Sequence, residues 1–150
     1  MGILWALFRT ARPRQWIKNA ALLAPVVFSG LLLVPGRLEK VMEAIVVFTL
    51  ISASVYIFND LLDIEADRKH PLKRKRPLPS GELPVSLAVF AMLAGVIIGL
   101  AWAYAMNMFF FGICLTYLVV SGLLYTYWLK NIPILDVITI ATGYILRVYA

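Results

Sequence analysis

The sequence has very little of what soluble or disulfide-stabilised proteins depend on. Charged residues make up 15% of the 150 residues and hydrophobic residues 62%, which excludes an ordinary soluble globular domain. Cys114 is the only cysteine, so no intrachain disulfide can form. His70 is the only histidine, which excludes a metal site built from several histidines. Residues 1–8 lack the charged start of a cleavable signal peptide, and we expect none.

Long apolar runs are what the sequence has instead. A bilayer core needs roughly 20 apolar residues per helix, and backbone that faces lipid must satisfy its own hydrogen bonds, which favours helices. We therefore predict an all-α integral membrane helical bundle within a lipid bilayer. The predicted spans are 16–34, 41–62, 84–105, 108–129 and a fifth that is still running from 134 to 150. Gly95 and Gly99 form a small-xxx-small pair that predicts close helix packing.

Basic residues are distributed unevenly between the predicted loops. With a cytoplasmic N-terminus, that side of the membrane receives eleven Lys and Arg residues, and the opposite side receives only Arg37 and Lys40. Because positive charge concentrates on the cytoplasmic side, we predict a multi-pass protein of the plasma (inner) membrane with the N-terminus and the 68–82 loop in the cytoplasm. That loop lies between two spans, so no nucleic-acid partner is expected.

An acidic cluster stands at the end of the second predicted span. On one helix, Asn59, Asp63 and Asp67 are spaced i, i+4, i+8 and share a face, with Asp60 one step around it. Carboxylates near a bilayer core cost roughly 3 kcal/mol each unless something compensates them. A Mg²⁺ ion that carries a phosphorylated substrate would do so. The sequence thus predicts a metal site of these four residues with the three aspartates catalytic; a solvated acidic helix end is the structural alternative.

A basic run follows the acidic cluster directly. Six Lys and Arg residues lie between positions 68 and 76. A metal-bound diphosphate needs carboxylates for the cation and basic groups for the remaining phosphate oxygens. The same run also acts as a topology signal, and an anionic-lipid patch is another reading. For His70, a loop hydrogen bond and a role in the site both stay open.

Polar residues also occur in and before the last predicted span. Lys130 is either a topology charge or a phosphate ligand. Asp136 and Arg147 are eleven residues apart, about 16 Å along a helix, so they share a face but each needs its own partner. An arginine this deep in a span usually faces a polar cavity or a partner inside the bundle.

The run Asn59-Asp60-x-x-Asp63-x-x-x-Asp67 resembles the NDxxDxxxD motif of the UbiA superfamily of intramembrane prenyltransferases. Within that superfamily, residues 12–19, 67–77 and 129–137 look most like the decaprenyl-phosphate phosphoribosyltransferase branch. The resemblance implies Mg²⁺-dependent transfer of 5-phosphoribosyl from phosphoribosyl pyrophosphate to a polyprenyl (decaprenyl) phosphate, in the synthesis of arabinose donors for cell walls. The residues predicted to bind phosphate or substrate are Lys18, His70, Lys73, Arg76, Lys130 and Arg147.

The chain also departs from the superfamily pattern. The superfamily fold has nine helices in roughly twice this length, with a second aspartate motif on the sixth. We therefore expect residues 1–150 to be the N-terminal part of one UbiA-type transmembrane domain, inactive by itself. Of the YxxxK motif only Lys130 is carried over, because neither Tyr125 nor Tyr127 has the required spacing. A UbiA-type prenyltransferase with an aromatic or haem acceptor, a transporter or lipid-binding module without turnover, and a homo-oligomer stay open.

Overall fold

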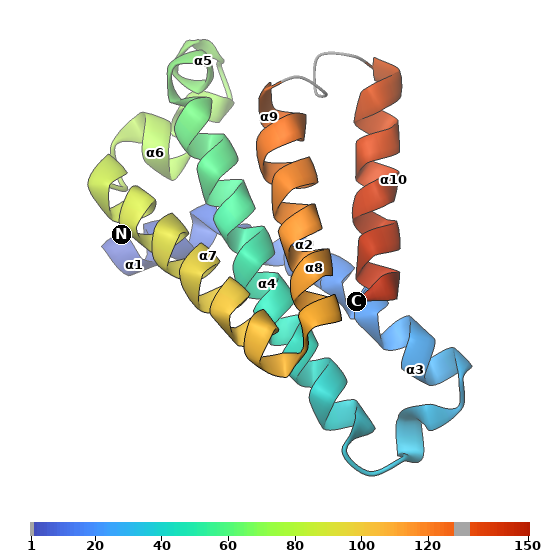
Figure 1. The fold of residues 1–150 in the computed structure, drawn as a ribbon. Coiled ribbons are helices and arrows are strands. Elements are labelled where there is room, and N and C mark those ends of the chain that lie inside the picture. The colour runs from blue at the N-terminus through green and yellow to red at the C-terminus, as the bar shows by residue number, and fades with distance from the viewer. Residues whose placement is uncertain (1, 128–132) are drawn as a thin grey trace.

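The computed structural model describes residues 2–127 and 133–150, and these residues are arranged as a bundle of helices (Figure 1). Two helices are long and apolar enough to cross a membrane, namely α4 (Arg37–Leu62) and α7 (Val85–Met106). They correspond to the predicted spans 41–62 and 84–105. The all-helical prediction is confirmed for the described part of the chain, and two of the five predicted spans have membrane length as single helices.

Helices α4 and α7 pack closely because glycines leave room where they meet. A Cβ atom added at Gly99 would lie 2.6 Å from Cγ1 of Ile51, which is closer than side-chain atoms approach one another. A Cβ atom at Gly95 would overlap the Ser54 hydroxyl on the same side of α4. The small-xxx-small pair of the sequence is therefore the contact face of α7.

A second helical hairpin follows at Asn107. This residue ends α7 and caps the next helix, because its side-chain oxygen accepts a hydrogen bond of 2.7 Å from the Phe110 N–H. The rod that follows matches the predicted span 108–129 as far as it is described, and the chain returns along α10 beside it (Figure 1). The rod consists of α8 (Met108–Tyr117), the π-helical η4 (Leu118–Leu124) and α9 (Tyr125–Tyr127). Helix α10 spans Pro133–Tyr149.

The predicted span 16–34 is wrong as a single helix. The segment consists of four short elements, α2 (Pro13–Trp16), the 3-10 helix η1 (Ile17–Leu23), α3 (Ala24–Phe28) and the 3-10 turn η2 (Leu31–Leu33). Pro25 has no N–H to donate to Ala21 and its ring crowds that carbonyl, so a regular α-helix cannot pass through it. Gly30, at φ 72°, then turns the chain in a left-handed conformation. Apolar content alone does not reveal such breaks.

The short helices near the N-terminus and after α4 form a collar around one end of the bundle. This collar consists of α1 (Ile3–Thr10), α5 (Ile64–Lys69), the 3-10 turn η3 (Lys73–Lys75) and α6 (Pro77–Ser80). Ala6 of α1 and Leu78 of α6 are buried together against Ile57 of α4 and Ala88 of α7. The 68–76 loop is therefore held at both ends by packed apolar residues.

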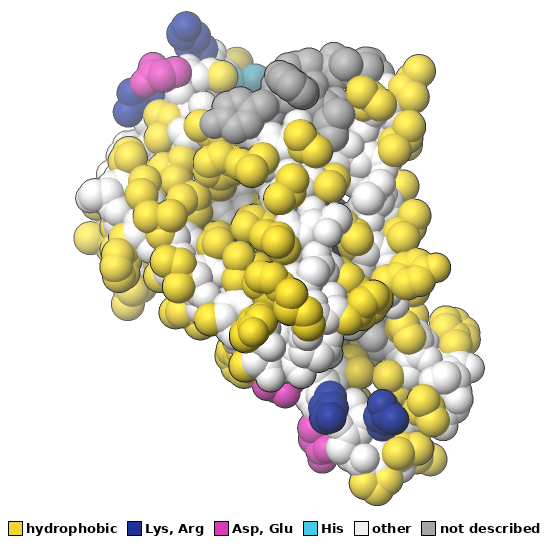
Figure 2. Space-filling view, in the orientation of Figure 1, with side chains coloured by type: hydrophobic (Ala, Val, Ile, Leu, Met, Phe, Trp, Pro, Cys, Tyr) yellow, Lys and Arg dark blue, Asp and Glu magenta, His cyan; other side chains and the backbone are white. Residues whose placement is uncertain are grey.

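The outer surface carries the properties of a membrane-embedded protein. Large apolar side chains such as Phe90, Ile97 and Phe109 are exposed on α7 and α8. In Figure 2 hydrophobic side chains cover the middle of the visible face, while charged side chains gather at its two ends. Inside, a core of Phe48, Ile51, Phe110 and Cys114 joins α4 to α8.

Candidate active site at the end of helix α4

Two nearly inaccessible carboxylates lie where α4 passes into α5. Asp60 is in the last turn of α4 and is 4% exposed, and Asp67 is in α5 and is 2% exposed. Between them Asp63 leaves helical geometry (φ −91°, ψ 4°), so α4 and α5 are separate helices. The predicted shared face of Asn59, Asp63 and Asp67 on one continuous helix is therefore corrected. In the structure it is Asp60 and Asp67 that reach a common partner.

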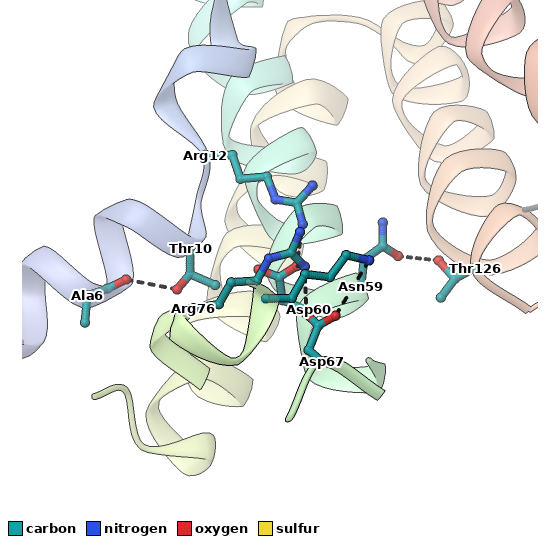
Figure 3. A network of polar contacts seen from close by, with 9 residues as sticks. Ala6, Thr10, Arg12, Asn59, Asp60, Asp67, Arg76 and Thr126 are labelled. Atoms are coloured by element: carbon teal, nitrogen blue, oxygen red, sulfur yellow. Dashed lines mark hydrogen bonds and ion pairs between the residues drawn. The ribbon is translucent and has the colours of Figure 1, made fainter. Parts of the chain in front are cut away.

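Arg76 is that common partner. Its Nη1 donates to Oδ2 of Asp67 at 2.7 Å and to Oδ1 of Asp60 at 3.3 Å (Figure 3). Arg76 is extended (φ −69°, ψ 153°) between η3 and α6, and Pro77 begins α6 immediately after it. Because α6 is packed into the collar, the loop returns the guanidinium to the carboxylates. One nitrogen thus joins acids from two helices, as charge-assisted hydrogen bonds allow.

Two further cations approach the same acids. Arg12, between α1 and α2, donates to Oδ1 of Asp60, and Nζ of Lys73 lies 3.8 Å from Oδ1 of Asp67. Arg12 is the one non-glycine residue with positive φ among the described residues, at 53°. A non-glycine backbone held in this sparsely populated region is a local strain that the surrounding contacts must maintain. Here they include Asp60 and the Tyr56 ring, whose centroid is 5.3 Å from the guanidinium carbon.

Asn59 faces a different neighbour from Asp60. Its side-chain oxygen accepts a hydrogen bond from the hydroxyl of Thr126 in α9, and Thr126 is buried. This bond ties the acidic end of α4 to the rod formed by α8, η4 and α9. Spacing arguments missed Thr126 and the pairing role of Arg12, since their contacts to α4 span 67 and 48 residues of sequence. The one available signal for Arg12 is its place at the start of the 12–19 motif.

The remaining predicted residues are divided between the loop and a cavity. Nδ1 of the exposed His70 accepts backbone N–H bonds from Leu72 (3.2 Å) and Lys73 (3.3 Å), so His70 shapes the loop. Its predicted phosphate contact stays a prediction. Lys130 lies outside the described residues, as does the side chain of Asp136. Lys18 and Arg147 line a separate cavity.

That cavity has a volume of about 290 Å³ and lies between η1, α4, η4 and α10. Arg147, 4% exposed, donates from Nε to the Asn19 side-chain oxygen (2.8 Å), from Nη1 to the Gly143 carbonyl (2.6 Å) and from Nη2 to the Tyr117 hydroxyl (3.2 Å). Arg12 and Asn59 also line it, so it adjoins the acidic cluster. A second cavity of about 290 Å³, lined by Arg12, Asp60 and Arg76, opens on the collar side.

The acidic cluster suits a divalent cation by the chemistry of its donors. Asp60 and Asp67 both reach the Arg76 Nη1, which shows that one cation can contact both carboxylates. Oxygen donors of this kind are what Mg²⁺ prefers. Across residues 2–127 and 133–150, however, no group of three acidic, histidine or cysteine side chains is placed to hold a metal ion. The predicted four-residue metal site therefore stays a prediction.

Comparison with known proteins gives this geometry a context. The family described as UbiA prenyltransferase matches residues 22–150. Decaprenyl-phosphate phosphoribosyltransferase of Mycolicibacterium smegmatis is 35% identical over 159 residues, which cover 99% of this chain and 48% of the relative. The enzyme of the same name from Mycobacterium tuberculosis is 34% identical over 158 residues, covering 99% and 50%. Nodulation protein NoeC of Azorhizobium caulinodans is 30% identical over 144 residues, covering 93% and 45%.

The chain spans about half the length of the curated relatives it matches. The family match covers most of the 150 residues and includes both halves of the acidic cluster, Asp60 and Asp67. Members of the family are membrane-embedded transferases that typically use Mg²⁺. On these matches the chain belongs to the UbiA prenyltransferase family.

Proposed function

We propose that these residues are the N-terminal part of a UbiA-type transferase that moves 5-phosphoribosyl from phosphoribosyl pyrophosphate to a polyprenyl phosphate. One observation carries the proposal: Arg76 joins the buried Asp60 and Asp67, with Arg12 and Lys73 alongside. Paired carboxylates and clustered basic groups are the two halves of a site for a metal-bound diphosphate. The similarity to decaprenyl-phosphate phosphoribosyltransferases supports the choice of donor and acceptor.

Donor binding is an exchange of partners in this proposal. The acids and bases of the cluster now satisfy one another through Arg12, Lys73 and Arg76. A diphosphate would give these three cations new anionic partners, and Asp60 and Asp67 would hold the Mg²⁺ that accompanies it. Charges that are matched before and after binding avoid the cost of an unpaired buried carboxylate, which is several kcal/mol.

Positioning and charge stabilisation carry out the reaction. The bond between the ribosyl C1 and the diphosphate oxygen breaks, and C1 bonds to an oxygen of the acceptor phosphate. Arg12, Arg76 and Lys73 hold the diphosphate as it leaves with the bonding electron pair. When Mg²⁺ is bound, it neutralises part of the charge on the departing diphosphate. Because the acceptor oxygen is already anionic, the site needs no strong general base.

We also propose that the collar faces the cytoplasm of a plasma-membrane protein. The support is the eleven-to-two distribution of basic residues. A cysteine introduced in the 68–82 loop of the full-length protein should then resist an impermeant reagent applied to intact cells. Ready labelling from outside would place the donor site on the wrong side of the membrane.

A direct assay tests the activity. Membranes that contain the full-length protein are incubated with Mg²⁺, polyprenyl phosphate and labelled phosphoribosyl pyrophosphate. Label is expected in the lipid fraction as polyprenyl-phosphoryl phosphoribose. If no label enters while the same membranes prenylate 4-hydroxybenzoate or a naphthoate, the protein is a UbiA-type aromatic prenyltransferase. If the protein binds polyprenyl phosphate or the aromatic compounds without converting them, the transporter or lipid-binding alternative is favoured.

A further inference from the structure

Arg147 is buried, and its partners differ from those of Arg12, Lys73 and Arg76. The guanidinium has five N–H donors, and three of them bond to a side-chain amide, a backbone carbonyl and a tyrosine hydroxyl. All three acceptors are neutral. Within the described ranges no carboxylate forms an ion pair with Arg147. Asp136 is about 16 Å away along α10 by helical rise.

The surroundings hold this charge in place without neutralising it. Its guanidinium carbon lies 5.0 Å from the centroid of the Tyr117 ring, 5.3 Å from that of Phe48 and 5.6 Å from that of Tyr144. Aromatic faces stabilise a cation through their quadrupoles but carry no net charge. Asn19 is in turn fixed, since its Nδ2 donates to Thr49 (2.9 Å) and Ser52 (3.2 Å). Arg147 is thus a preorganised cation whose charge has no counter-ion among the described residues.

The adjoining cavity has the lining that a small anion needs. Lys18 lies at its edge, with Nζ 6.0 Å from the centroid of Tyr144, and is only partly buried. Tyr56 and Tyr144 also line it and can donate hydroxyl hydrogen bonds. Arg12 and Asn59 form the boundary with the acidic cluster. An anion held between Lys18 and Arg147 therefore lies on the bundle side of the diphosphate site.

We infer that this cavity binds a phosphate monoester, held by Arg147 and Lys18 with the tyrosine hydroxyls as additional donors. The inference rests on the proposed function for the two phosphates that fit this description. One is the 5-phosphate of the ribosyl donor, and the other is the terminal phosphate of the polyprenyl acceptor. Both are anionic and would therefore give Arg147 a negatively charged partner. Both must also lie near the diphosphate during transfer.

Equilibrium binding to the full-length protein in phosphatidylcholine nanodiscs tests the inference without any turnover. The probes are labelled ribose 5-phosphate and labelled farnesyl phosphate. Arg147→Gln is expected to weaken the binding of one probe by about tenfold or more and to leave the affinity for the other unchanged. The probe that is weakened identifies the source of the phosphate. Arg37→Gln, the same exchange at the start of α4, is the matched control and should leave both affinities unchanged.

A purely structural role for Arg147 predicts other results. If a folded Arg147→Gln protein binds both probes as the unaltered protein does, the inference is overturned. It is also overturned if binding of unphosphorylated farnesol or ribose falls as much as that of its phosphate. If Arg147→Gln does not fold, Lys18→Gln is the test, because Lys18 lies at the edge of the cavity. This exchange should weaken the binding of one probe and leave the other unchanged. Unchanged binding of both probes would refute the site. If the unaltered full-length protein binds these phosphates but has no transferase activity, only the proposed function is refuted.

Discussion

The acidic cluster and the Arg147 cavity solve the problem of buried charge in opposite ways. In the cluster, Asp60 and Asp67 are balanced by Arg12, Lys73 and Arg76, so a ligand has to exchange partners with groups already paired. In the cavity, the partners of Arg147 among the described residues are neutral, so an anion adds a partner and displaces no acid. The first arrangement suits a substrate that brings both signs of charge, and the second suits a simple anion.

Metal removal should separate the two regions most strongly. EDTA is expected to abolish transfer by the full-length protein, and Mg²⁺ in excess should restore it. The melting temperature without substrate is expected to be the same with and without EDTA, because arginines already satisfy the carboxylates. Activity assays and thermal melts of one preparation measure both. A large stabilisation by Mg²⁺ alone would mean that the metal, and not Arg76, normally holds the two acids.

Asp67→Asn should reduce transfer on the order of a thousandfold, which is about 4 kcal/mol of transition-state stabilisation. The amide keeps the shape of the side chain and an acceptor for Arg76, but it removes the charge that a cation needs. Turnover of labelled phosphoribosyl pyrophosphate in membranes measures the effect. Glu65→Gln, the same chemical change at an exposed position of α5, serves as the control and should be close to the unaltered protein.

Arg76→Lys should raise the donor KM by about tenfold or more, equivalent to about 1.4 kcal/mol. The lysine ammonium keeps the charge, but it lacks the rigid guanidinium plane that holds Nη1 between Asp60 and Asp67. Arg74→Lys, two residues earlier on the exposed part of the loop, should leave KM unchanged. Equal effects at both positions would indicate a diffuse basic patch in place of a defined contact.

Thr126→Val is expected to produce the smallest change. It removes the hydroxyl that donates to Asn59, and one such hydrogen bond contributes about 1 kcal/mol of stabilisation. Transfer should therefore fall roughly fivefold, with little effect on phosphate binding in the Arg147 cavity. Thr116→Val is the matched control in α8, since the Thr116 hydroxyl bonds only to the Gly112 carbonyl on an exposed face. Unaltered activity in Thr126→Val would mean that Asn59 does not need this tether.

The sequence predicted the position of the acidic cluster well, because a polar motif at the end of an apolar run is a local signal. It did not predict how the cluster is built. A shared helix face of Asn59, Asp63 and Asp67 requires α4 to continue through Asp67. In the structure α4 ends before Asp63, and Asp60 and Asp67 are the residues that contact Arg76. The contacts of Arg12 and Thr126 with α4 depend on how distant segments pack, and no spacing encodes that.

The same limit applies to the fold. The lengths of α4 and α7 follow from unbroken apolar runs, and Gly95 and Gly99 marked their contact in advance. The segment 16–34 is equally apolar, but Pro25 and Gly30 divide it into short elements. That division buries Asn19 beside Arg147. Two polar residues of this region, Lys18 at the edge of the cavity and Asn19 beside Arg147, therefore come from a segment whose composition predicts only a plain lipid-facing helix.

The glycine contacts between α4 and α7 also bear on how the proposed polyprenyl acceptor would enter. Since Ile51 fills the space over Gly99, these two helices cannot separate or slide without losing close packing on both sides. They act as a rigid wall behind the two charged regions. We expect lateral access from the bilayer on the opposite side, where α10 meets η1. There the proposed acceptor, a polar head on an apolar tail, would match a polar cavity beside exposed apolar helices.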